Sequence, residues 1–202
     1  MNYRRTASAL ATLALASLAG AATFDIDPSH SSASFKVRHM MISNVKGNFS
    51  KLTGSVEYDA AKAGATRIDT VIDASTITTA EPKRDAHLKS PDFFDVAKFP
   101  TITFKSKNVT RTGDQQYKAL GDLTIHGVTK QVTLAVDTTP EVKDPWGNTR
   151  FGASATTRIN RKDFGLTWNQ ALEAGGVLVG EDVDTTIEVE LVKKAATPKT
   201  TD

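Results

Sequence analysis

The residue types best suited to chemistry gather in one charged segment, where Arg84, Asp85 and His87 lie within four positions. An imidazole titrates near neutral pH and can move a proton, and a guanidinium can bind two oxygens of a phosphate or carboxylate at once. The segment lies on the longest stretch without strand-like sequence, and long excursions in compact domains are often functional. A solvated, charged helix is the plainer interpretation, and composition alone favours it.

Two further candidates lie at the ends of alternating, strand-like runs. If Phe35 and Val37 face the interior of a sheet, His39 faces it as well, because side chains alternate along a strand. Arg161 stands in a basic stretch that precedes Phe164, and the same stretch could simply be a turn that ends a strand. We therefore treat His39 and Arg161 as candidates to contact a polar group.

The common catalytic and metal-binding patterns are missing. The histidines, at positions 30, 39, 87 and 126, show neither the i, i+4 nor the His-x-His spacing typical of zinc sites. No Gly-x-Ser-x-Gly elbow, P-loop or Gly-x-Gly-x-x-Gly turn is found, which argues against the common hydrolase, NTPase and dinucleotide classes. The absence of Cys excludes disulfides, thiolate metal sites and a cysteine nucleophile. We expect no catalytic residue, no metal and no cofactor.

The first 21 residues have the order of a secretory signal peptide. Arg4 and Arg5 precede an uncharged, Ala- and Leu-rich run of about 15 residues, too short to span a membrane as a helix. Small residues then suit cleavage after Ala21 or Ala22; a buried N-terminal helix is the alternative. Removing residues 1–21 takes away two Arg and no acid, so a formal charge of +2 becomes zero. We expect a periplasmic or secreted protein that does not bind nucleic acid or span a membrane.

From Phe24 onward the apolar residues recur mostly at every second position, as in antiparallel strands with one wet face. We count about eight strand-like runs, starting near residues 31, 46, 66, 101, 117, 128, 149 and 182. Such strands form a sandwich or a closed up-and-down barrel, and closure is favoured because it removes exposed edges. Alternation does not distinguish a filled interior from a hollow one.

Two stretches interrupt the alternation. Residues 81–99 have helix-start signals at Pro82 and again at 90–92, and residues 166–174 have the pattern of a short helical turn. The small, polar residues 195–202 predict a disordered tail. The sequence therefore predicts one all-β domain over residues 22–194, with one or two short helical excursions.

Several of these segments together resemble the YceI-like family of periplasmic polyisoprenoid-binding proteins, over about residues 24–192. The resemblance rests on five motifs, and it departs from the family pattern at His126, where Arg or Asn is expected. The motifs are FKVRHM at 35–40, RDAHLKSPDFFD at 84–95, KFP at 98–100, GDLTIHGVTK at 121–130 and NRKDFGL at 160–166.

The resemblance implies an eight-stranded, lipocalin-like barrel around a long apolar cavity that holds a long-chain isoprenoid or other amphiphilic lipid, without established catalysis. Side chains on the inward parity could line such a cavity, and a second, polar set could form a rim for the headgroup. The expected lining is Phe35, Val37, Ile72, Phe104, Leu123, Phe151 and Trp168; the expected rim is His39, Arg84, Asp85, His87 and Arg161.

Three functions are compatible with the sequence. The first is a lipid carrier that works by sequestration, with a homodimer suggested only by the general frequency of two-fold dimers. The second is an enzyme that acts on a bound lipid with His39, Asp85 and His87 as acid–base groups. The third is a filled barrel that serves only as an interaction domain.

Overall fold

The computed structural model describes residues 21–59, 62–173 and 175–195, so the expected signal peptide and most of the expected tail lie outside the described residues. Within them, no helix is long and apolar enough to cross a membrane. One short α-helix, α1 (Pro82–Lys89), accompanies a twelve-stranded sheet. The strands are β1 (Ala22–Ile26), β2 (Ser32–His39), β3 (Ser43–Phe49), β4 (Leu52–Tyr58), β5 (Arg67–Asp73), β6 (Ile77–Thr78), β7 (Thr101–Gly113), β8 (Gln116–Ile125), β9 (Val128–Thr138), β10 (Val142–Lys143), β11 (Thr149–Asn160) and β12 (Val179–Lys193).

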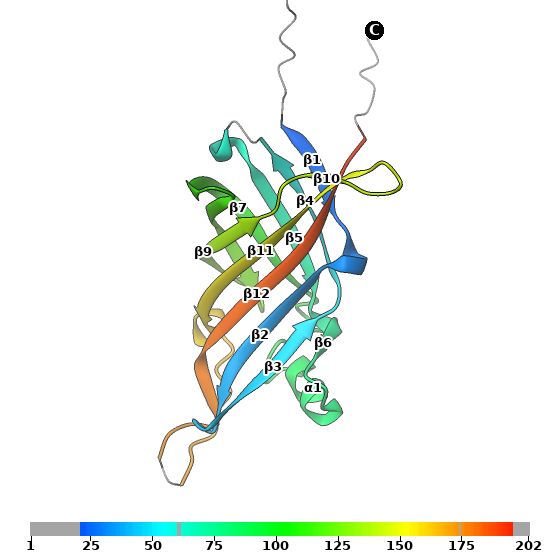
Figure 1. Ribbon diagram of the computed structural model, residues 1–202. Coiled ribbons are helices and arrows are strands. Elements are labelled where there is room, and N and C mark those ends of the chain that lie inside the picture. The colour runs from blue at the N-terminus through cyan, green and yellow to red at the C-terminus, as the bar shows by residue number, and fades with distance from the viewer. Residues whose placement is uncertain (1–20, 60–61, 174, 196–202) are drawn as a thin grey trace, which may run out of the picture.

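Eight of these strands close into a barrel (Figure 1). Hydrogen-bonded neighbours follow the order β11-β9-β8-β7-β5-β4-β1-β12, and they run antiparallel. Eleven residue pairs between β11 and β12, from Arg150 opposite Val192 to Asn160 opposite Asp182, complete the ring. The predicted all-β, eight-stranded antiparallel barrel is confirmed, and the sandwich is excluded.

The long strand β12 pairs with β11 along one edge and with two strands, β1 and β2, along the other. Its last residues pair with β1, and its first part pairs with β2, which in turn pairs with β3. The two-residue β6 follows β3 in the sheet, and α1 lies against β6 at the lower end in Figure 1. The sequence pattern missed β1, β4, β6 and β10 as separate strands. The turn at Ser50 and Lys51 contains no Gly or Pro, so β3 and β4 looked like one run.

Helix α1 begins where its capping residues predict. The Glu81 carboxylate accepts a hydrogen bond from the Lys83 backbone N–H at 3.0 Å, and Pro82 occupies the first turn, where its missing N–H is not needed. Residues 81–99 are helical in part, as expected, but the second helix start expected at 90–92 is wrong. The chain leaves the helix after Lys89 and forms successive turns, with Asp95 at a positive φ of 45°.

The expected helical turn at 166–174 is also displaced along the chain. A short 3-10 helix, Arg161–Phe164, comes directly after β11, and Gly165 ends it in the left-handed conformation with φ of 80°. Gly165 is suited to this position because it has no Cβ to clash. Residues 166–173 form no helix.

An ion cluster fastens the β10–β11 hairpin to the barrel. Arg150 donates from Nε to Asp144 at 2.7 Å, and from Nη1 to Asp27 at 2.8 Å and to Glu190 at 2.6 Å. The hydrogen bond from Arg150 lowers the pKa of Asp27 to about 2. Partial burial raises the pKa of Asp144, but hydrogen bonds from Asn148 and Arg150 outweigh it and lower that pKa to about 2.

Replacing the central cation should change how the fold responds to acid. Because the pKa values of Asp27 and Asp144 are lowered from 3.8 in the folded state, their stabilisation is present above about pH 4 and is lost as the pH falls toward 2. Arg150→Met should lower Tm at pH 7 and flatten the fall of Tm between about pH 4 and 2. Circular dichroism melts over this range measure both effects. In Arg111→Met, which loses an exposed pair with Asp114, the acid profile should match wild type; an unchanged profile in Arg150→Met would contradict the assignment.

Candidate functional site

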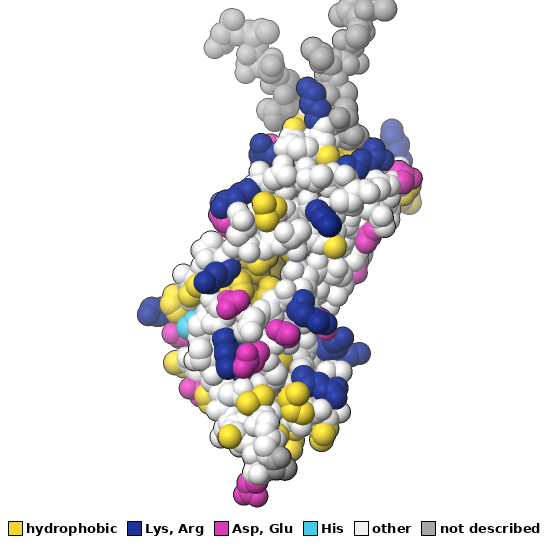
Figure 2. Space-filling view, turned by 90° about the vertical axis from the view of Figure 1, so that its left-hand side faces the viewer, with side chains coloured by type: hydrophobic (Ala, Val, Ile, Leu, Met, Phe, Trp, Pro, Cys, Tyr) yellow, Lys and Arg dark blue, Asp and Glu magenta, His cyan; other side chains and the backbone are white. Residues whose placement is uncertain are grey.

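The barrel encloses an elongated cavity of about 250 Å³. All eight barrel strands contribute to its lining, together with β2, β3 and α1. The cavity reaches from Tyr58 and Thr138, near the end of the barrel where β1 begins and β12 ends in Figure 1, to Arg161 and Val179 at the opposite end. Its lining is predominantly aliphatic and aromatic. Figure 2 shows hydrophobic side chains within a recess at mid-height of the barrel wall.

Two glycines help to keep the interior hollow. A Cβ on Gly47 would lie 2.4 Å from Phe35 Cζ, and a Cβ on Gly121 would lie 2.5 Å from Phe104 Cζ. Each phenyl ring therefore occupies the space above a glycine on a neighbouring strand, against the barrel wall. Because these large side chains lie along the wall, they leave room in the lumen that they would otherwise fill.

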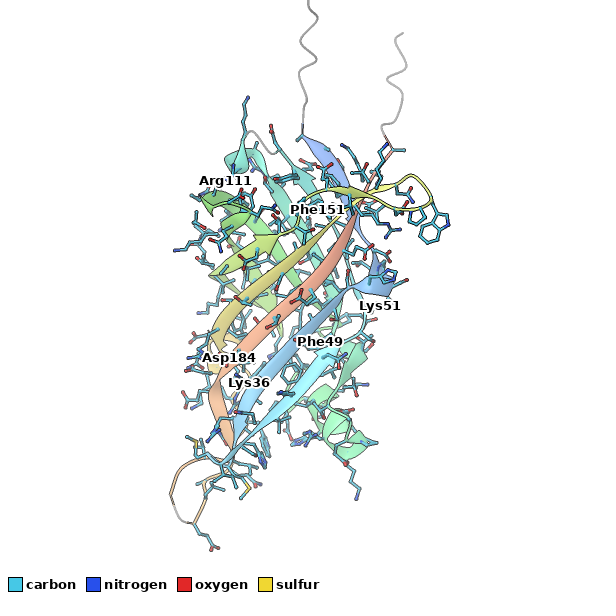
Figure 3. The ribbon with its side chains drawn as sticks, viewed as in Figure 1. Lys36, Phe49, Lys51, Arg111, Phe151 and Asp184 are labelled. Atoms are coloured by element: carbon cyan, nitrogen blue, oxygen red, sulfur yellow. The ribbon has the colours of Figure 1, made fainter. Side chains whose placement is uncertain are left out.

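Six of the seven expected lining residues face this cavity, and the seventh does not. The six are Phe35, Val37, Ile72, Phe104, Leu123 and Phe151. Trp168 instead packs among rings at the helical end, with centroid distances of 4.8 Å to His87 and 5.2 Å to Phe93. Figure 3 shows Phe151 and Arg111 toward the same end of the barrel, where β1 begins and β12 ends.

Arg161 is the rim candidate that lines the cavity. Its residue is only 4% exposed, and its guanidinium donates to the backbone carbonyls of Gly180, Val179 and Leu166. Burial lowers the pKa of this guanidinium, while the charge of Glu181 opposes the shift. None of its hydrogen bonds goes to a carboxylate among the described residues, and three carbonyls leave two of its five N–H groups for another acceptor.

The candidates on α1 are engaged outside the cavity. Arg84 donates from Nε to Thr79 Oγ1 at 2.7 Å, and the Asp85 carboxylate accepts from the Thr79 N–H at 2.7 Å. Burial raises the pKa of Asp85, but the hydrogen bonds from Thr79 and Thr78 bring it below its ordinary value. His87 Nε2 lies 2.8 Å from the Asp92 carboxylate. The contacts of Arg84 and Asp85 hold the helix to Thr78 and Thr79 before it, and His87 holds it to the turn that follows.

His39 lies at the end of β2, opposite Val179 and Ser43 on the neighbouring strands, and does not line the cavity. His126, the departure from the family pattern, occupies the two-residue turn between β8 and β9 at a φ of 52°. Its ring packs on Phe99 at a centroid distance of 4.6 Å. His39, Asp85 and His87 therefore do not converge on the cavity as a set of acid–base groups.

The sequence pattern missed the polar groups at the other end of the cavity. The Tyr58 and Tyr117 hydroxyls lie 3.1 Å apart, and burial together with this contact raises the pKa of Tyr58 to about 12. Both rings also border a polar hollow of about 280 Å³, lined in addition by Arg111 and Glu141. Alternation could have placed Tyr117 inside, but only pairing across the barrel brings it to Tyr58.

Thr66 was also missed, because nothing in its local sequence marks it. It is 4% exposed, it lines the cavity, and its Oγ1 has no hydrogen-bond partner among the residues that the structure describes. Buried hydroxyls are usually paired, because an unpaired one loses its contacts with water. The Thr66 hydroxyl is therefore available to a polar atom in the cavity.

Among the described residues, one cluster consists of side chains that commonly bind metal ions. Donor atoms of Asp27, His30 and Glu190 lie within 4.8 Å of one another on the outside of the barrel. The Arg150 guanidinium donates to both Asp27 and Glu190 and so already supplies the positive charge there. The arrangement is that of an ion-pair cluster, and it lies apart from the cavity.

Comparison with known proteins agrees with this geometry. The model of the YceI-like domain matches residues 24–191. A UPF0312 protein of Vibrio cholerae is 37% identical over 186 residues, which cover 91% of this chain and 94% of that protein.

Two solved structures share the fold. The chain is similar to BcnA of Burkholderia cenocepacia, with a TM-score of 0.72 and 22% identity over 82% of this chain and 98% of that one. It is also similar to a polyisoprenoid-binding domain from Saccharophagus degradans, with a TM-score of 0.61 and 16% identity over 86% of this chain and 99% of that one. The family match over most of the folded residues, together with the barrel, leads to one conclusion: the chain belongs to the YceI-like family.

Proposed function

We propose that this protein is a periplasmic or secreted carrier that sequesters a long-chain isoprenoid or similar amphiphilic lipid in its barrel cavity. The observation that carries the proposal is the elongated, apolar cavity between Tyr58 and Arg161. Three further observations support it: the signal-peptide pattern of residues 1–21, the membership of the YceI-like family, and the similarity to a polyisoprenoid-binding domain.

The physical basis is the transfer of a hydrocarbon chain out of water. Each buried CH₂ contributes about 0.8 kcal/mol, so about ten such groups gain on the order of 8 kcal/mol before the entropic cost of ordering the chain. A cavity lined from all sides by Phe, Ile, Val and Leu side chains offers this environment along its length. The small residues on β11, such as Ala155, leave space where larger ones would fill it.

Polar groups at the ends of the cavity would fix the orientation of the lipid. Arg161 has two N–H groups that could reach oxygens of a phosphate or another polar head. Thr66, toward the opposite end with Tyr58 and Tyr117, offers a hydroxyl that can donate to a neutral oxygen. We place the headgroup at Arg161. The other expected rim residues have no direct contact with the lipid in this proposal and only support the structure around that end: Arg84, Asp85, His87 and His39.

Filling the lumen should abolish binding. Ala155→Phe projects a ring into the cavity from β11 and should weaken binding of a fluorescent polyprenyl lipid by at least about tenfold, because the chain loses its space. The matched control is Thr156→Phe, which places the same ring on the exposed outer face of the same strand. Fluorescence titration gives both affinities, and Tm reports folding.

The two variants also give the result that would contradict the proposal. If the folded Ala155→Phe protein bound the lipid as tightly as Thr156→Phe, the lipid would not occupy the cavity. Absence of binding by the wild-type protein would remove the carrier function altogether.

The unpaired hydroxyl gives an independent test of the polar end. Thr66→Val removes a buried hydroxyl without a partner and keeps the shape, so we expect the free energy of unfolding to rise by about 1 kcal/mol without added lipid. Thr79→Val is the matched control, because its hydroxyl is bonded to Asp85 and Arg84, and it should lose about 1–3 kcal/mol. Urea denaturation measures both. Equal losses in the two variants would show that Thr66 is already paired.

A further inference from the structure

The turn between β2 and β3 has an unusual backbone for its sequence. The Ile42 N–H donates to the His39 carbonyl at 3.1 Å, and both central residues have positive φ, 49° at Met40 and 61° at Met41. Positive φ at both central positions is the geometry of a type I′ turn, for which Asn-Gly is the preferred pair. Methionine has a Cβ that makes this conformation costly. The sequence thus keeps two large apolar side chains where small ones would be more stable.

These side chains also face solvent. Met40, Met41 and Ile42 are 40%, 53% and 75% exposed, and we call these three residues the Met40–Ile42 tip. Two hydrogen bonds from the Arg38 guanidinium to the Met41 carbonyl, at 3.1 and 2.9 Å, hold the turn in place. A Cβ on Gly176 would lie 3.5 Å from Met41 Cγ, so the loop before β12 lies beside the tip. The Met40–Ile42 tip is therefore apolar and exposed, and its backbone is held by hydrogen bonds.

The strands behind the tip carry positive charge. Residues 36–46 contain Lys36, Arg38 and Lys46 and no Asp or Glu. Lys36 and Lys46 lie directly opposite each other on β2 and β3, an arrangement that costs stability because like charges repel. Lys36 is paired with Asp184 on β12 at 3.1 Å, as Figure 3 shows, whereas Lys46 is exposed and has no ion pair among the described residues. The neighbouring loop, residues 169–178, carries a single acid, Glu173. The start of β12 beside β2 carries Glu181, Asp182 and Asp184, of which Glu181 pairs with Lys162 and Asp184 with Lys36 and Arg158.

The tip is continuous with one end of the cavity. Val37, three residues before Met40, lines the cavity, as does Val179, which pairs with His39. The Met40 N–H donates to the Leu178 carbonyl at 2.8 Å, one residue from Val179. Arg161, which donates to the Val179 carbonyl, lies at this same end.

We propose that the Met40–Ile42 tip is a docking site for a bilayer surface that contains anionic phospholipid, placing the Arg161 end of the cavity at the membrane. The inference rests on the proposed carrier function, because a lipid that is insoluble in water must pass between bilayer and cavity. Apolar side chains insert at the boundary between headgroups and acyl chains, and nearby cations bind the anionic headgroups. An apolar tip backed by Arg38 and by Lys46, exposed and without an ion pair in the described part of the chain, fits both requirements.

The opposite end of the barrel supplies the internal comparison. The β10–β11 hairpin exposes Trp146 by 81% and Val142 by 60%, so it is also apolar. Its turn is rigidified by Asp144, which accepts hydrogen bonds from the backbone N–H groups of Trp146 and Asn148. It has no pair of residues held in a costly conformation and no run of cations without acids. The same molecule therefore carries a matched apolar control at the far end.

Vesicle flotation tests the docking site. Vesicles of phosphatidylcholine with about one third phosphatidylglycerol are compared with phosphatidylcholine alone. The double variant Met40→Asn/Met41→Gly should fold with a Tm about 2–4 °C higher, because the new pair suits the turn, yet partition at least about tenfold less onto anionic vesicles. Lys46→Gln should reduce partitioning about fivefold on anionic vesicles only. Trp146→Ser should partition like wild type. All proteins share one N-terminus, so any contribution from residues 1–20 is constant.

The outcomes separate the alternatives. Loss of partitioning in Trp146→Ser with no change in the double variant would place the membrane contact at the other end and overturn the proposal. Failure of the wild type to bind either kind of vesicle would overturn it too. That result is expected if the tip contacts a protein partner instead of a bilayer.

A second readout keeps this proposal distinct from the carrier function. Each variant is titrated with the fluorescent polyprenyl lipid delivered from ethanol, without vesicles. We expect the double variant to bind it with wild-type affinity. If the wild type floated with anionic vesicles but bound no polyprenyl lipid, the result would count against the cavity proposal alone. If the double variant bound the lipid and also floated like the wild type, the result would count against the tip alone.

Discussion

The backbone ladder that closes the barrel is the constraint on which the rest of this structure depends. A protein with a hollow interior and no disulfide gives up the packing contacts that a filled core supplies, so its walls must hold themselves together. Closure between β11 and β12 leaves no unpaired edge along those two strands, and side chains packed against the inner wall supply buried apolar area. Phe24, Leu52 and Leu191, each at most 1% exposed, show how deeply that wall is packed. The cavity persists because the wall, and not its centre, carries the stability.

Several local departures from good packing lie beside the cavity or at its end. Gly47 and Gly121 weaken their strands but allow aromatic rings to lie flat, and Thr66 leaves a hydroxyl without a partner inside. At the end near Arg161, Met40 and Met41 take a backbone conformation that glycine or asparagine would adopt at lower cost. Such strain is usually retained where function requires it. In this chain Thr66 lines the cavity, the two glycines lie under Phe35 and Phe104, which line it, and Met40 is bonded to Leu178 beside its Arg161 end. This arrangement is expected if lipid binding and delivery shaped the sequence.

Much of the fold could be predicted because strand periodicity is a local property. The inward parity of Phe35, Val37, Phe104 and Leu123 follows from alternation alone, and the family motifs added closure into a barrel. The site was harder. Trp168 was expected in the lining but follows a 3-10 helix and a left-handed Gly165, and no strand parity applies after such a turn. The rim candidates on α1 were chosen by residue type. In the structure, however, Asp85 and Arg84 form hydrogen bonds with Thr79 and do not line the cavity. Thr66 and the Tyr58–Tyr117 pair depend on contacts across the barrel, which a linear pattern does not contain.

The proposed carrier function requires the cavity to hold a long-chain lipid in the protein taken from its cell. Native mass spectrometry of the protein, purified without detergent, tests this most directly. We expect a mass above that of the polypeptide by one long-chain lipid, which dissociates under collisional activation and is recovered in organic extract. A mass equal to the polypeptide alone, in protein that also takes up no added polyprenyl lipid, would contradict it.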